Sequence, residues 1–99
     1  MQELQVGSVV KSLKGHDKDK IFVVVEVVSD KYVRIADGKT RKISAPKLKK
    51  VKHLESNGEI LEKVQQIISQ KVPLYDKIIK ISLKKYYNQN GGNNFGKKR

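Results

Sequence analysis

The chain has 99 residues, of which 22 are basic and 10 are acidic, so its formal net charge at pH 7 is +12. Because it contains no cysteine, thiol nucleophiles, disulfide frameworks and zinc sites that need a cysteine are excluded. No window approaches the roughly 18 apolar residues of a membrane span, and the first residues lack the basic flank and apolar run of a signal peptide, so we expect a cytoplasmic protein.

Residues 1–54 are predicted to form a small all-β unit. Its strand candidates are short, rich in β-branched residues and bounded by polar turns, and they lie at residues 9–13, 21–28, 32–36, 40–44 and 47–54, the last centred on Val51. Five short strands within about 50 residues indicate a small barrel or a curled sheet.

The segment 21–28 (IFVVVEVV) is the strongest strand candidate. Both of its faces are largely apolar, which predicts a central strand covered on both sides. The strand at 32–36 alternates cleanly, with Val33 and Ile35 expected to face inward. Residues 29–31 are expected to form a tight turn, and the Asp37–Gly38 pair predicts a type I′ hairpin leading to the strand at 40–44.

Residues 55–88 change to a helical period and are predicted to form a helical hairpin. Ser56 and Glu59 have the spacing of a capping box at the start of the first helix. Pro73 is expected to open the second helix in its first turn. The apolar stripes must lie on the barrel, between the helices or against another chain, and they consist of Ile60, Leu61, Val64, Ile67 and Ile68, then of Leu74, Tyr75, Ile78, Ile79, Ile81 and Tyr86.

The last residues, 89–99, are rich in Asn and Gly and carry three basic side chains and no acidic one. Such a segment cannot bury a core, so we expect a flexible basic tail. The sequence does not decide whether this tail becomes ordered on a partner.

The positive charge lies mainly in the predicted β unit, which has a net charge of +7, against +2 for residues 55–90. This distribution favours a polyanionic partner for the β unit, with nucleic acid ahead of an anionic membrane. The segment 39–53 contains no carboxylate, and its seven basic residues exceed what protection of a strand edge requires. On a continuous strand, Lys50 and Lys52 would point the same way, opposite Val51. These seven predicted binding residues are Lys39, Arg41, Lys42, Lys47, Lys49, Lys50 and Lys52.

The segment VGSVVKSLKGHDKDKIFVVVEVV (6–28) resembles a KOW motif, the RNA-associated module of several ribosomal proteins and NusG-type transcription factors. The match lies in Gly7, the Val9–Val10 pair, Gly15, the GHDKDK loop and the hydrophobic strand that follows. Continued to residue 54, the chain resembles the ribosomal protein fourteen-e group and its short bacterial relatives. The resemblance implies an SH3-like five-stranded barrel, association with RNA or the ribosome, and no catalysis; whether the role is in assembly, translation or regulation is left open by the sequence.

The resemblance also implies that the loop at 14–20 contacts RNA. Asp19 stands where the motif usually has a glycine with positive φ, so a strained or differently shaped loop is expected. With few aromatic residues, the contacts are expected to be mainly to phosphates and 2′-hydroxyls of structured RNA; Phe22 is expected in the core, and Tyr32 either there or on the surface. The predicted loop contacts are Lys14, Gly15, His16, Lys18 and Lys20.

Catalysis, metal binding and a cofactor are not expected, because neither His16 nor His53 has neighbours at ligand spacing and no phosphate-cradling glycine loop is present. The main alternative is a protein-interaction or dimerisation module of the SH3-like class with only generic affinity for polyanions. The shortage of aromatic residues disfavours a peptide groove, while the helical stripe keeps a homodimer open. An anionic membrane would require a more basic amphipathic helix.

Overall fold

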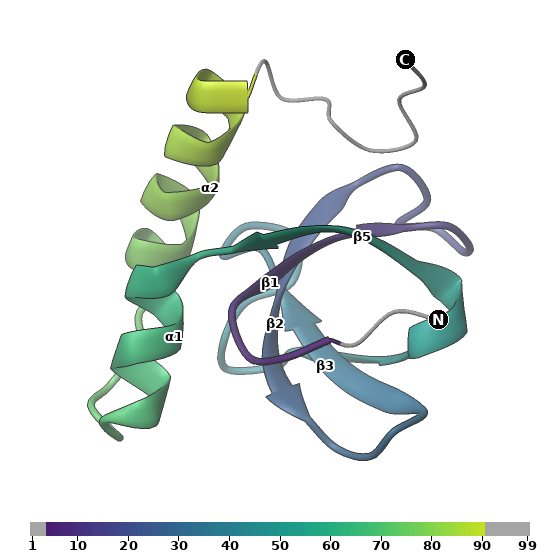
Figure 1. Cartoon of the computed structure of the whole chain (residues 1–99), viewed down its shortest axis with the longest axis horizontal. Helices are drawn as coiled ribbons and strands as arrows, with labels where there is room; N and C mark the ends of the chain where they lie inside the picture. The colour runs from purple at the N-terminus through teal and green to yellow at the C-terminus, as the bar shows by residue number, and fades with distance from the viewer. Residues whose placement is uncertain (1–3, 91–99) are drawn as a thin grey trace.

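The computed structural model describes residues 4–90, with side chains as far as Tyr86, and shows a mainly β chain that ends in two helices (Figure 1). The strands are antiparallel and form one sheet in the order β4-β3-β2-β1-β5. A 3-10 helix, η1, separates β4 from β5. The elements are β1 (Ser8–Ser12), β2 (Ile21–Val27), β3 (Tyr32–Ala36), β4 (Lys47–Lys50), η1 (Val51–His53), β5 (Leu54–Ile60), α1 (Glu62–Ser69) and α2 (Asp76–Asn90).

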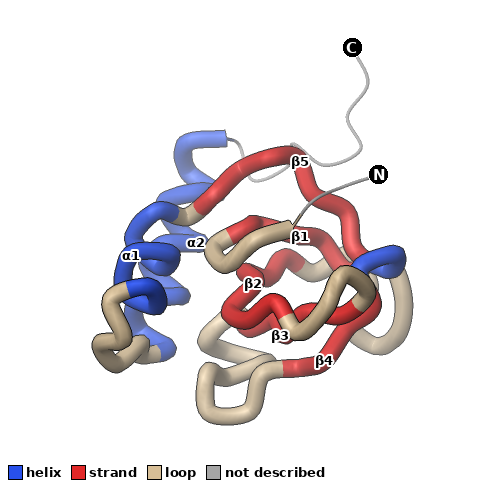
Figure 2. Tube along the Cα trace, turned by 60° about the horizontal axis from the view of Figure 1, so that its bottom comes forward, coloured by secondary structure: helices blue, strands red, loops and turns tan. Residues whose placement is uncertain are grey.

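The sheet curls around a hydrophobic cluster. Val33 of β3 and Leu54 of β5 belong to the same buried cluster, although β2 and β1 lie between their strands in the sheet. In a flat sheet the two strands would be about 14 Å apart, given a spacing of about 4.8 Å between neighbours. The sheet must therefore bend its edges toward each other, and the curl is visible in Figure 2.

Strand β2 is covered on both faces, as its sequence predicts. Phe22 and Val24 are fully buried in the cluster inside the curl, whereas Val23 and Val25 lie in a second cluster shared with the helices. Only the end of the strand, at Glu26 and Val27, is exposed. The packing on both faces makes β2 the strand that joins the two hydrophobic clusters.

The two helices lie side by side on one side of the sheet (Figure 1) and pack their apolar residues on β2 and β3. Val64 of α1 and Ile79 and Leu83 of α2 are buried there. Of the three arrangements left open by the sequence, the structure therefore shows packing on the sheet. Tyr75 and Ile81, which the predicted stripes included, are exposed instead. Tyr75 precedes α2, and Ile81 lies off the face on which Ile79 and Leu83 are buried four residues apart.

Residues 55–60 form a strand, so the prediction of a helix in this segment is wrong. Its backbone pairs with β1, for example Ser56 with Val10. The capping box is also absent: Leu61 is the N-cap of α1 without a side-chain cap, and the Ser56 hydroxyl accepts a hydrogen bond from the Gly58 N–H instead. The helical region begins only after β5.

The β3–β4 connection is a long loop rather than a tight hairpin turn. Residues 40–44 form no strand, and the type I′ turn is also wrong, because Gly38 (φ 78°) but not Asp37 has a positive φ. The Asp37 carboxylate accepts hydrogen bonds from the backbone N–H groups of Lys39 and Arg41, at 2.9 and 2.8 Å. This local network stabilises a wider turn.

One further prediction from the sequence is confirmed and another is wrong. The predicted tight turn at 29–31 is confirmed, since the N–H groups of Val28 and Ser29 both donate to the Tyr32 carbonyl. The strand predicted over 47–54 is interrupted, because η1 begins at Val51 and contains Lys52. Lys50 and Lys52 therefore do not form the row on one strand that the sequence suggested.

Helix α1 ends in a Schellman motif. The N–H of Lys71 donates to the Ile68 carbonyl and the N–H of Val72 to the Ile67 carbonyl. Lys71 has a φ of 60°, in the left-handed region that normally favours glycine. The chain then passes Pro73 without turning into a helix, so the prediction that Pro73 opens the second helix is wrong.

We expect the substitution Lys71→Gly to stabilise the protein by about 1 kcal/mol, because glycine removes the steric cost of the left-handed conformation. For a domain of this size the gain corresponds to roughly 4–8 °C in Tm. Thermal unfolding followed by circular dichroism measures it. An unchanged or lower Tm would mean that the Lys71 side chain offsets its backbone cost.

Helix α2 continues to Asn90, so the first two residues of the predicted tail are helical, and residues 91–99 lie outside the described part of the chain. Within residues 4–90, no helix combines the length and the apolar character needed to cross a membrane.

Candidate nucleic-acid interface

The β1–β2 loop, residues 13–20, is closed by its own backbone. The Ser12 N–H donates to the Lys20 carbonyl, and the Asp19 N–H donates to the Ser12 carbonyl, at 3.0 and 2.7 Å. Asp19 has a φ of 72°, in the left-handed region that favours glycine. The loop is thus a compact turn whose shape is set by main-chain contacts.

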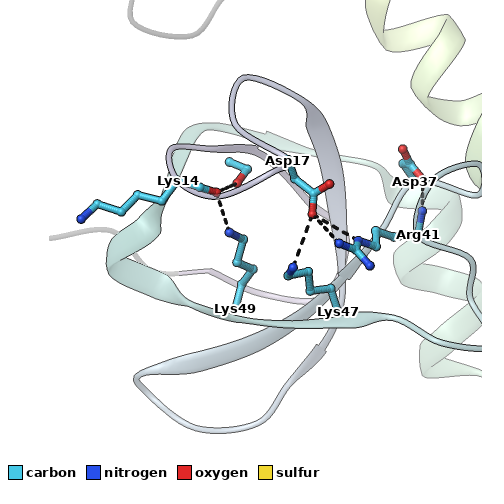
Figure 3. A network of polar contacts seen from close by, with 7 residues as sticks. Lys14, Asp17, Asp37, Arg41, Lys47 and Lys49 are labelled. Atoms are coloured by element: carbon cyan, nitrogen blue, oxygen red, sulfur yellow. Dashed lines mark hydrogen bonds and ion pairs between the residues drawn. The ribbon is translucent and has the colours of Figure 1, made fainter.

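Asp17 anchors the loop to other parts of the chain through its side chain. Its carboxylate is almost fully buried, and its Oδ2 accepts hydrogen bonds from Nε and Nη2 of Arg41 at 3.1 and 3.0 Å (Figure 3). Nζ of Lys47 lies 3.8 Å from the same oxygen. The segment 39–53 contains no carboxylate, so its sequence suggested that its basic residues are unpaired. Some of them are paired, because this carboxylate comes from a different part of the chain.

Lys49 anchors the loop at a second point, near its start. Its Nζ donates to the Lys14 carbonyl at 2.8 Å, and the Ser12 hydroxyl donates to the same oxygen at 3.0 Å (Figure 3). Lys49 is buried, and this burial, together with the charge of Lys47, lowers its pKa. Lys49 therefore supports the loop backbone rather than presenting its charge to solvent.

The outer side of the loop presents the side chains of Lys14, His16, Lys18 and Lys20, all exposed. The residues predicted from the motif thus lie together on one short, fixed turn. The backbone of Gly15 is part of that turn, with a φ of 85°.

A second group of cations adjoins the loop at η1. The Leu13 N–H donates to the His53 carbonyl at 2.9 Å, which joins the loop to η1. Burial lowers the pKa of His53, and the positive charges nearby lower it further. These charges belong to Lys14, Lys50, Lys52 and Lys49. The predicted residues Lys50 and Lys52 are therefore close to the loop.

Lys39 and Lys42 lie elsewhere. They are exposed on the β3–β4 loop, between Gly38 and Ile43, which both contact α2 near Asp76. Lys50 is the last residue of β4 and Lys52 lies in η1, at the other end of that strand. The structure therefore does not bring all twelve predicted residues into one surface.

The structural role of Asp17 is not predicted from the sequence, because nothing in its neighbours indicates burial. The only signal is the excess of cations in 39–53, which makes a buried carboxylate partner favourable.

Among residues 4–90, no group of three His, Asp or Glu side chains is arranged to hold a metal ion. Comparison of the chain with models of known protein families and with curated proteins found no match.

Proposed function

We propose that the protein binds structured RNA without catalysis, with ribosomal RNA or a ribosome-associated RNA as the expected target. The observation that carries this proposal is the division of the β1–β2 loop into two sides. Asp17 and the Lys14 carbonyl bind protein groups on the inner side, whereas the side chains of Lys14, Lys18 and Lys20 are exposed on the outer side. A fixed loop loses little conformational freedom when its cations meet phosphates.

The fold supports the same proposal. A curled antiparallel sheet of five strands, with a 3-10 helix before the last strand, is compatible with the SH3-like barrel that the resemblance of residues 6–54 to KOW proteins implies. The basic loop and η1 lie away from α1 and α2, which cover the other side (Figure 2). The helices therefore leave the proposed RNA surface open.

The proposal is tested by replacing Lys14, Lys18 and Lys20 together with Ala. We expect affinity for a folded ribosomal RNA fragment to fall about tenfold or more at 100 mM salt, and the slope of log K against log salt to fall by about 2–3, since up to three phosphate contacts are lost. Fluorescence anisotropy at several salt concentrations measures both quantities. The melting temperature is expected to change little, because these side chains are exposed.

The matched control replaces Lys63, Lys77 and Lys84, three exposed lysines of α1 and α2, with Ala. Both triple variants lose the same charge, so only the location differs. Equal losses in the two variants, or equal binding of folded RNA, unstructured RNA and duplex DNA, would reduce the interaction to generic polyanion affinity. Unchanged affinity in the loop variant would contradict the proposal.

Binding is also expected to depend on pH through His53. In the free protein its pKa lies below the ordinary value of 6.5 because of burial and nearby lysines. Phosphates among those lysines would raise this pKa, so the complex takes up a proton and affinity rises several-fold as pH falls from 7.5 to 5.5. We expect His53→Gln to flatten this dependence and His16→Gln to retain most of it. A profile that His53→Gln leaves unchanged would contradict the expectation.

Dimerisation remains the alternative for the helical hairpin. Its main stripe is buried on the sheet, but Tyr75, just before α2, and Ile81 of α2 are exposed. Light scattering at high protein concentration tests this alternative, and a monomeric mass would remove it.

A further inference from the structure

A groove of about 1080 Å³ lies beside η1, between the β2–β3 turn and the segment that precedes β1. Leu4, Val27, Val33 and Val51 give it an apolar lining. Val33 is buried and Val27 is 44 % exposed, so the lining runs from the hydrophobic cluster to the surface. This volume is sufficient for a nucleoside-sized group.

The walls of the groove are held by hydrogen bonds. The Val51 N–H donates to the Lys31 carbonyl at 2.8 Å, which fastens η1 to the β2–β3 turn. Tyr32 pairs with Lys50 across β3 and β4, and both residues line the groove. Main-chain contacts therefore hold η1, β4 and the β2–β3 turn together along this part of the groove.

The charges around the groove indicate the chemistry of its occupant. Lys31, Lys50 and Lys52 contribute three positive charges, against one negative charge from Asp30. An apolar anchor from a protein partner would favour a site depleted of charge. An unpaired nucleotide instead combines a base with apolar faces and a phosphate on either side, which matches an apolar lining with cations at its rim.

The groove is also continuous with the proposed RNA surface. Lys50 and Lys52 line the groove and also lie among the lysines around His53. We infer that the groove binds an unpaired nucleotide of the RNA, with its base against Tyr32 and the apolar lining and its phosphates at Lys50 and Lys52. This inference rests on the proposed function and names the RNA feature that the protein selects.

The test compares two RNA hairpins that differ by one bulged nucleotide, 2-aminopurine, in an otherwise continuous stem. We expect the full chain to bind the bulged hairpin about tenfold more tightly than the continuous one, since one base is stacked. We also expect the fluorescence of the bulged base to be quenched. Anisotropy and 2-aminopurine fluorescence at 100 mM salt measure the two effects.

Two pairs of variants locate the effect. Val27→Gln lies in the groove, and its matched control Leu48→Gln changes a similarly exposed residue of β4 outside it. Tyr32→Leu removes the aromatic ring, and Tyr32→Phe retains it. We expect Val27→Gln and Tyr32→Leu to reduce the preference for the bulge below about threefold while binding of the continuous hairpin is retained. Leu48→Gln and Tyr32→Phe are expected to keep the preference, and thermal unfolding checks that each variant is folded.

The other outcomes contradict the inference in distinguishable ways. Equal binding of the two hairpins by the unchanged protein would overturn it and leave RNA binding intact. A preference that survives in both Val27→Gln and Tyr32→Leu would place the base elsewhere. A preference that appears only after deletion of residues 1–3, which precede the groove residue Leu4, would assign the groove to the chain's own first residues. Binding of neither hairpin would remove the proposed function together with the inference.

Discussion

The substitution Asp17→Asn is expected to lower the free energy of unfolding by about 2–3 kcal/mol. It leaves Arg41 and Lys47 facing an amide instead of a buried carboxylate, and breaking a buried ion pair on one side typically costs about 3–5 kcal/mol. The expected loss of about 2–3 kcal/mol is smaller than this typical value, because the Arg41 side chain is 32 % exposed. Chemical denaturation measures the loss.

The same substitution separates loop geometry from charge in RNA binding. Asp17→Asn adds one positive charge to the protein, so charge alone would increase affinity. If the fixed loop matters, affinity falls roughly fivefold, because the freed loop must be ordered again on binding. Anisotropy with the folded RNA fragment decides between the two.

Asp19→Asn is the matched control, since it makes the same charge change in the same loop. Asp19 is exposed, and its only ion pair among the described residues is at 3.8 Å to Lys11. Asparagine also tolerates the positive φ of this position. We expect a stability change within about 0.5 kcal/mol and equal or higher affinity. A similar loss of stability in both variants would contradict the anchoring role of Asp17.

Replacing Gly38 with Ala is expected to destabilise the protein by roughly 3 kcal/mol. A Cβ at this position would lie 2.5 Å from the Asp76 carbonyl oxygen at the start of α2, so either the loop or the helix must move. The left-handed φ of 78° adds about 1 kcal/mol or more for a residue with a side chain. Movement here also strains the hydrogen bond, at 2.7 Å, from the Ile43 N–H to the Asp76 carboxylate.

Gly58→Ala separates the two contributions. Gly58 has a φ of 88°, but a Cβ there would meet no other atom within 4 Å. This variant therefore carries only the backbone cost of about 1 kcal/mol. Thermal unfolding of both variants gives the difference, which reports the close approach of Gly38 to α2. Equal losses would mean that the loop adjusts without disturbing the helix.

The strands with strong local signals were predictable from the sequence. Residues 21–28 and 32–36 combine β-branched composition with clear facing patterns, and the structure places β2 and β3 there. The strand β5 was not predictable in the same way. Its sequence, LESNGEI, is polar and contains Gly58, and its stability as a strand comes from pairing with β1. The spacing of Ser56 and Glu59 predicts a helix start by a local rule, which pairing with a distant strand overrides.

In the candidate site, too, local features were predictable from the sequence and contacts between distant residues were not. The exposure of Lys14, Lys18 and Lys20 follows from their position in a short polar loop, and the structure shows it. The contact between Asp17 and Arg41 joins residues 24 positions apart and depends on how the β3–β4 loop, which carries Arg41, lies against the β1–β2 loop. The sequence shows the excess of positive charge but not which basic side chains pair with groups of the protein itself.

The sheet order has a consequence for how the chain can assemble. Strands β1 to β4 pair with their neighbours in the chain, so these ladders become available as soon as each strand has been synthesised. The ladder between β1 and β5 joins Val10 to Ser56, so it forms only after β5 has been synthesised. Because closing such a long segment costs entropy before its contacts form, β1 keeps one unpaired edge until that point. The helices that follow β5 can then pack on a sheet that is already complete.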